Sequence, residues 1–174
     1  HSEKFNLISI SHHSTKIEGS TLTALETQIL LDDGLTPKGK SVSDTLMVTD
    51  HFKALHFIID KARNKTAVTT ELIKDINSYV MKSTGGIYNT ILGEIDASKG
   101  MFRKGNVTAG SSYFPNYDKV ERLTNELVSF IKTKMNDNLS IDDQLNLSFD
   151  VHFNLVSIHP FYDGNGRTSR LLMN

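Results

Sequence analysis

The chain has 174 residues, no cysteine and a formal net charge of −1 at pH 7, with 38% apolar and 22% charged residues. This length suits one domain with one buried core, and the charge argues against a nucleic-acid binder that works by bulk electrostatics. The lack of cysteine excludes disulfides and thiolate metal sites and favours a reducing cytoplasm, while no apolar run approaches the roughly 20 residues needed to cross a bilayer.

The first half of the chain predicts helices. Helix patterns cover four segments, residues 8–17, 21–31, 51–62 and 69–80. Gly34 is placed to end the second helix, and Thr69 to cap the start of the fourth. We expect His51 to lie on the surface of the third helix or at the edge of the core.

A different pattern follows from Met101 to Phe114. Val107 and Tyr113 favour strands, and Gly110 lies where the chain can turn. The segment therefore predicts a small β-hairpin in an otherwise all-α fold. Arg103, just before this hairpin, is expected to be solvated.

Two helices are expected after the hairpin, over residues 118–135 and from Ser140 to Ile158, with Ser140 as an N-cap. His152 lies on the second of these helices and is expected to be a hydrogen-bonded core residue. The chain then stops at Asn174 inside an apolar helix pattern, so we expect either missing residues after it or a short frayed helix. The whole of residues 1–174 predicts one domain.

The segment that carries chemistry is residues 159–170, which read HPFYDGNGRTSR. Pro160 cannot continue the preceding helix, while Gly164 and Gly166 permit backbone angles that other residues resist. A new helix can begin near Gly166. A glycine loop at a helix N-terminus attracts anions, because free N–H groups and the helix dipole point toward the ligand.

Charged and titratable side chains surround this loop. Arg167 and Arg170 lie three apart and so share a face, where two guanidinium groups suit a polyphosphate. Asp163 could hold Mg²⁺ beside substrate phosphates, and His159 suits a general base. The set indicates transfer to or from a nucleotide phosphate. The alternative is a Gly-Asn-Gly turn between two helices with surface arginines.

Residues 159–170 match the Fic family signature, HPFx(D/E)GNGRxxR, at every defined position. The resemblance covers most of the chain, from about Ser14 to Asn174, and is weak outside the motifs. It implies an all-α Fic fold with a small β-hairpin called the flap, here residues 106–114. It also implies transfer of AMP from ATP to a Ser, Thr or Tyr hydroxyl of a target protein. Gly164 favours AMP transfer, since relatives with other chemistries tend to carry alanine there.

The resemblance implies a role for each matched residue. His159 would deprotonate the target hydroxyl, and Asp163 would hold Mg²⁺, or Mn²⁺, on the α- and β-phosphates. Arg167 would stabilise charge on the phosphate chain, and Arg170 would grip the γ-phosphate. The anion hole would consist of Gly164, Asn165 and Gly166. The side chain of Asn165 would also contact phosphate, and pyrophosphate would leave.

Near the start of the chain, residues 14–19 read STKIEG and resemble the inhibitory motif (S/T)xxxE(G/N) of Fic proteins. By this resemblance an inhibitory helix spans about residues 5–19, with Ser14 and Glu18 as its motif residues, and Glu18 pairs with Arg170. Arg170 cannot hold a carboxylate and a γ-phosphate equally well, so the pair would hinder productive ATP binding. The alternative is an exposed glutamate at a helix end.

Other functions stay open at this point. Glu18 could position a water for removal of AMP from a modified protein, or the chain could be a catalytically silent ATP-binding module. The expected partner is a protein with an acceptor hydroxyl that pairs with the flap by β-augmentation, through a surface that includes Val107, Gly110 and Tyr113. We expect no nucleic-acid or membrane partner and a cytoplasmic location, and the resemblance leaves room for a homodimer.

Overall fold

The computed structural model describes residues 2–136 and 138–174, and in these residues the chain is mostly helical, as predicted. The helices are α1 (Ser2–Ile17), α2 (Ala24–Asp33), α3 (Val42–Arg63), α4 (Thr70–Val80), α5 (Val120–Lys134), α6 (Ile141–Ile158) and α7 (Asn165–Met173). The strands are β1 (Ile87–Thr90), β2 (Gly93–Asp96), β3 (Thr108–Ala109) and β4 (Ser112–Tyr113), and the short 3-10 helices are η1 (Ala97–Lys99) and η2 (Tyr117–Lys119).

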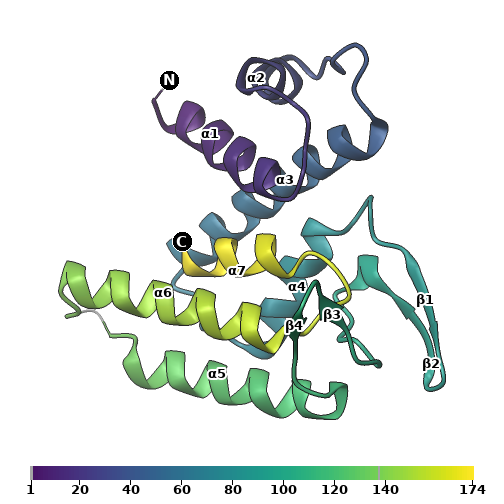
Figure 1. Ribbon diagram of the computed structural model, residues 1–174. Helices are drawn as coiled ribbons and strands as arrows, with labels where there is room; N and C mark the ends of the chain where they lie inside the picture. The colour runs from purple at the N-terminus through teal and green to yellow at the C-terminus, as the bar shows by residue number, and fades with distance from the viewer. Residues whose placement is uncertain (1, 137) are drawn as a thin grey trace.

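Helix α7 lies at the centre of the helical arrangement. It packs against α6, α4, α3 and the end of α1, so the last helix of the chain contacts the first (Figure 1). The long helix α3 joins two regions, with α1 and α2 on one side and α4 and α7 on the other. None of the helices in the described residues is long and apolar enough to cross a membrane.

Side-chain caps set the starts of α2, α3, α4 and α6. Thr69 and Ser140 accept hydrogen bonds from the first turns of α4 and α6, as predicted, and Gly34 ends α2 in the left-handed region. Helix α2 begins later than predicted because Thr23 is its N-cap and forms a capping box with Glu26.

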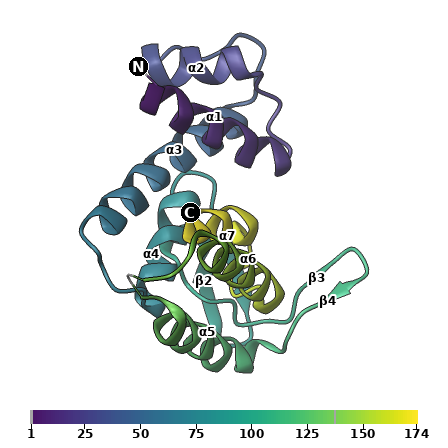
Figure 2. The ribbon, with the colours of Figure 1, turned by 90° about the vertical axis from the view of Figure 1, so that its left-hand side faces the viewer.

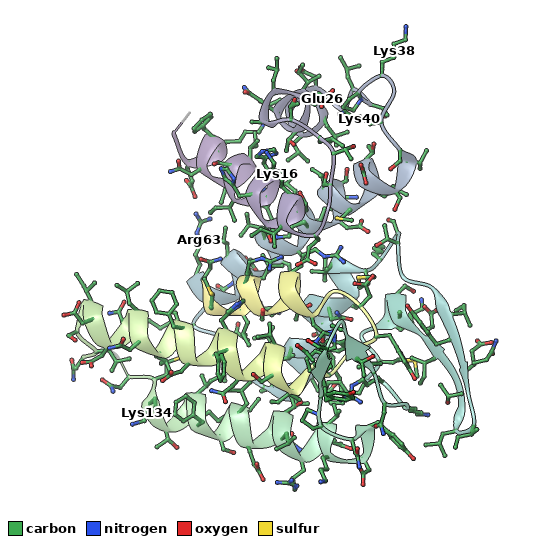
Figure 3. The ribbon with its side chains drawn as sticks, in the orientation of Figure 1. Lys16, Glu26, Lys38, Lys40, Arg63 and Lys134 are labelled. Atoms are coloured by element: carbon green, nitrogen blue, oxygen red, sulfur yellow. The ribbon has the colours of Figure 1, made fainter. Side chains whose placement is uncertain are left out.

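Helix α1 begins at Ser2 rather than at residue 8. Its serines lower the intrinsic helix propensity, but packing against α2 and α3 outweighs that preference. Lys40 helps to hold the turn after α1, because it donates to the Thr21 carbonyl and pairs with Glu26 at 3.3 Å (Figure 3).

Three apolar clusters are buried in the described residues, and two of them surround the loop before α7. One lies between α4, α5 and α6, and Phe161 from the loop before α7 fills it. The other lies between α3, α4 and α7. The stripe predicted on α4 is buried, and its members are Leu72, Ile73, Ile76 and Val80. Helix α4 therefore contributes to both clusters and supports the loop at the start of α7.

Two antiparallel hairpins complete the fold. The predicted hairpin is β3–β4, in which Ala109 pairs with Ser112 around Gly110, whose φ is 57° (Figure 2). The β1–β2 hairpin was not predicted, and Figure 1 shows it extending beyond the helices. Its tip exposes 96% of Ile91.

We expect Ile76→Ala to destabilise the protein by about 2–5 kcal/mol, because Ile76 is fully buried and its loss leaves a cavity. The matched control is Ile91→Ala at the exposed hairpin tip, which should change the free energy of unfolding by less than about 0.5 kcal/mol. Urea denaturation followed by circular dichroism measures both. Equal effects would contradict the described core.

Candidate active site

The segment between α6 and α7 forms a tight loop. Helix α6 ends at Ile158, and His159 caps it with φ 51°, in the left-handed region that few non-glycine residues adopt. Gly164, with φ 77°, is the N-cap of α7, which begins at Asn165, one residue before the predicted start. A β-carbon on Gly164 would lie 2.8 Å from the Met81 sulfur, so a larger residue here would displace that side chain and also strain the backbone.

Asn165 closes the loop on itself. Its side-chain oxygen accepts from the backbone N–H of Phe161 at 3.0 Å, and its side-chain nitrogen donates to the Phe161 carbonyl at 2.9 Å. The side chain is 4% exposed. The resemblance implies a phosphate contact for this side chain, whereas in the structure both of its polar atoms bind backbone. Asn165 therefore shapes the loop that carries the glycine N–H groups.

The two arginines have different surroundings. Arg167 is 3% exposed and pairs at 3.2 Å with Asp163, whose side chain is 55% exposed. The same Asp163 oxygen accepts from the N–H of Gly164 at 2.5 Å. Among the described residues, Nε and Nη1 of Arg167 are buried without a hydrogen-bond partner. Unpaired buried donors are costly, so these two N–H groups mark a place where an anion would be stabilised.

Arg170 is held by the end of α1. Its Nη2 pairs with the Glu18 carboxylate at 2.5 Å, and its Nε and Nη2 donate to the hydroxyl and carbonyl of Ser14, each at 3.0 Å. The predicted pair between Glu18 and Arg170 is confirmed as a contact. A β-carbon on Gly166 would lie 2.5 Å from a Glu18 oxygen, so the carboxylate lies directly against the glycine loop.

His159 lies between the loop and the flap. Its ring stacks on Phe114, with 3.9 Å between ring centroids and 17° between ring planes. Burial is the main cause that lowers the pKa of His159, and the charge of Arg103 lowers it further. A hydrogen bond to the backbone of Val156 and the charges of Asp163 and Glu18 oppose this shift. The net result favours a neutral imidazole, which can accept a proton.

Arg103 is the main residue that sequence reasoning misjudged. The expected solvated role is wrong, because the side chain is 2% exposed. Its guanidinium donates to four carbonyls, those of His159 at 2.7 Å, Gly105 at 2.9 Å, Pro115 at 2.5 Å and Ile158 at 3.4 Å. Burial lowers its pKa. An isolated arginine in a polar segment gives no periodic signal of burial, so only the fold reveals this role.

Two further histidines are hydrogen-bonded to serine hydroxyls and have no assigned role as bases. His152 is hydrogen-bonded to the Ser169 hydroxyl at 3.0 Å, as expected of a core residue, and burial lowers its pKa. His51 was placed at the helix surface or core edge, and this is wrong, since it is 1% exposed. It contacts the Ser11 hydroxyl at 3.1 Å, and burial, assisted by Arg167 and Arg170, lowers its pKa to about 3.

The remaining predicted residues lie apart from the loop. Tyr113 is 86% exposed on the β3–β4 hairpin, Val107 is half-buried just before it, and Gly110 makes its turn. Within the described residues there is no cluster of three or more His, Cys, Asp or Glu side chains that could hold a metal ion. Asp163 and Glu18 are the two carboxylates that the structure places against this loop.

Comparisons with known proteins agree with this geometry. The Fic/DOC family profile matches residues 67–174. The Protein adenylyltransferase Fic of Aedes aegypti is 32% identical over 173 residues, which cover 99% of this chain and 32% of that protein. The protein of the same name in Drosophila melanogaster is 31% identical over 164 residues, 94% of this chain and 30% of that protein. The chain spans about a third of the length of these relatives.

Solved structures share the fold. A Fic-domain-containing signalling protein from Bacteroides thetaiotaomicron superposes with a TM-score of 0.82 at 23% identity, over 99% of this chain and 63% of that one. Fic-1 from C. elegans superposes with a TM-score of 0.74 at 26% identity, over 96% of this chain and 46% of that one.

We expect the buried His51 to make the fold sensitive to acid. Because its folded pKa of about 3 lies below the ordinary value of 6.5, the unfolded chain binds the proton first, and stability falls as pH drops from about 6.5 toward 3. Between pH 7 and pH 5, the free energy of unfolding of His51→Gln should fall by about 2 kcal/mol less than that of the parent. Urea unfolding across this pH range measures it, with the exposed His56→Gln on the same helix as control. An unchanged pH slope would contradict the assignment.

Proposed function

This chain belongs to the Fic/DOC family, and we propose that it transfers AMP from ATP to a hydroxyl group of a target protein. One observation carries the proposal. A single loop holds a half-buried imidazole at His159 and, at the start of α7, a glycine N-terminus next to two unpaired guanidinium N–H groups of Arg167. A base beside an anion site is what attack on a nucleotide phosphate requires. The names of the relatives from Aedes aegypti and Drosophila melanogaster support the same activity.

In the proposed reaction, His159 takes the proton of the target hydroxyl. The hydroxyl oxygen attacks the α-phosphorus of ATP, the bond between the α-phosphorus and the bridging oxygen breaks, and pyrophosphate leaves with that oxygen. The lowered pKa of His159 supports this role, because a neutral imidazole can take the proton.

The start of α7 supplies the phosphate site. The backbone N–H groups of the glycine loop, the unpaired donors of Arg167 and the helix dipole all favour negative charge. Since the side chain of Asn165 binds backbone, we assign the phosphate contacts of this segment to its N–H groups. Arg170 holds the γ-phosphate in the active state.

Asp163 is the proposed ligand for Mg²⁺ or Mn²⁺. Its side chain is 55% exposed and presents a carboxylate next to the phosphate site. One carboxylate fits Mg²⁺, which takes few protein ligands and completes its octahedron with water and substrate phosphates. The bound ion would neutralise charge on the α- and β-phosphates. The contact with Arg167 orients the carboxylate for this task.

We propose that Glu18 inhibits the enzyme. The carboxylate binds Arg170 and lies against Gly166, so it competes with phosphate for both the guanidinium and the loop. Because both anions bind the same cation, each lowers the affinity of the protein for the other. Ser14 adds two acceptors for the same guanidinium and holds it in the inhibited orientation.

The proposed target pairs with an edge of the flap. Ala109 and Ser112 flank the two-residue turn and bond to each other, so the backbone groups of the next pair, Thr108 and Tyr113, point outward. An extended target segment can add to either edge as a strand. The homodimer, the lack of nucleic-acid and membrane partners and the cytoplasmic location stay predictions from the sequence.

We expect Glu18→Gly to raise AMP transfer roughly tenfold or more, because Arg170 becomes available to the γ-phosphate. The measurement is transfer of α-labelled phosphate from ATP with Mg²⁺ onto the protein itself and onto proteins of a cell lysate. Glu3→Ala, which breaks an exposed ion pair of the same helix with Arg63, should leave the rate unchanged.

Further variants separate the competing functions. Addition of His159→Ala to Glu18→Gly should abolish labelling. Release of AMP from a modified protein that needs Glu18 would favour the hydrolase instead. ATP binding without any transfer, with Glu18 present or absent, would favour a silent binding module and refute AMP transfer.

We expect Thr108→Pro to reduce labelling of lysate proteins while self-labelling persists, because proline removes an outward N–H and leaves the hydrogen bonds of the hairpin intact. Thr108→Ala is the control, since it keeps the backbone N–H. The comparison is made in the Glu18→Gly background. Undiminished lysate labelling would refute pairing at this edge, and equal loss of both signals would indicate misfolding.

A further inference from the structure

The flap residue Phe114 covers one face of the His159 ring. The ring centroids are 3.9 Å apart and the planes differ by 17°, which is a stacked arrangement. Phe114 is half-buried and directly follows β4, whereas its neighbour Tyr113 is 86% exposed. The imidazole cannot rotate about its Cβ–Cγ bond without displacing the Phe114 ring or opening the stack.

Arg103 holds the two stacked residues in register. Its Nη2 donates to the carbonyl of Pro115, the residue after Phe114, and its Nε donates to the carbonyl of His159 itself. Both backbone segments are therefore attached to one buried guanidinium. Because of this attachment, the buried Arg103 side chain holds the stack of Phe114 on His159, and the stack does not depend on the hairpin alone.

A second contact involves the same ring. The backbone of Val156 also acts on the imidazole and raises its pKa, while the stack fixes the plane of the ring. The charged groups that act on the imidazole are Arg103, Asp163 and Glu18. Phe114 adds no charge, so its effect is to restrict the orientation of the ring and to keep water from one face.

We propose that Phe114 is a positioning residue that holds the His159 imidazole in the orientation for proton transfer and couples the base to the flap. This inference rests on the proposed AMP transfer. It means that a target segment bound on the flap and the base that deprotonates it are positioned by the same short piece of backbone. A small error in this geometry reduces the rate without weakening nucleotide binding.

The test uses the full chain in the Glu18→Gly background. Phe114→Ala should lower kcat for AMP transfer by about tenfold and leave KM for ATP unchanged. The acid limb of its pH–rate profile should move to higher pH, since water then reaches the imidazole and the protonated form gains stability. Phe114→Tyr keeps the stacked ring and should retain the rate within about twofold. Phe149→Ala, at an exposed phenylalanine of α6, is the matched control.

A readout independent of activity accompanies the kinetics. NMR titration of the His159 ring proton, assigned by its loss in His159→Ala, should show a higher pKa in Phe114→Ala than in the parent. Phe114→Leu keeps apolar volume without a ring, and if it matches the parent in rate and titration, the positioning role is refuted. The Phe114→Leu variant also tests the proposal if Phe114→Ala does not fold. If Glu18→Gly transfers no AMP at any pH, the proposed function fails, while the titration still decides whether the stack controls His159.

Discussion

The site depends on one buried arginine whose recorded hydrogen bonds, within the described part of the chain, all go to backbone carbonyls. The guanidinium of Arg103 meets the last carbonyls of α6, which have no partner inside the helix, and the negative end of that helix dipole partly offsets the buried charge. Its other bonds reach Gly105 and Pro115, one on each side of the β3–β4 hairpin. One side chain thus joins the end of the helix that precedes the proposed base, the loop that follows this helix, and the two ends of the flap.

The contact between α1 and the rest of the protein is unusually polar. The residues of α1 that are at most 5% exposed are Ile8, Ser11, His12, Ser14 and Thr15, and only Ile8 is apolar. Hydrogen bonds to His51 and Arg170 accompany the apolar contacts of Leu7 and Ile8 at this interface. Since water can replace such bonds at a small net cost, a polar interface is easier to open than an apolar one of the same area. This suits a helix whose proposed task is to block a site reversibly.

Sequence reasoning succeeded where a local pattern has a local cause. Thr69 and Ser140 cap helices because the cap needs only the first turn, and residues 159–170 define the loop because proline and glycine restrict their own backbone. The pair between Glu18 and Arg170 was expected only through the family resemblance, since 152 positions separate the partners.

The misses share a physical origin in long-range contacts. Arg103 and His51 carry polar side chains that pattern reading assigns to a surface or a core edge, yet carbonyls and hydroxyls from distant segments allow their burial. The β1–β2 hairpin, whose tip exposes Ile91, was also not predicted. No periodicity within a short window contains this information.

The backbone of His159 carries a consequence for the protein's stability. A non-glycine residue in the left-handed region is strained by about 1–2 kcal/mol relative to glycine, which adopts it freely. The protein therefore holds its proposed base at a position where the backbone of glycine would be unstrained. Selection for thermal stability alone would act against the backbone strain at this position, whereas the proposed catalysis requires the histidine.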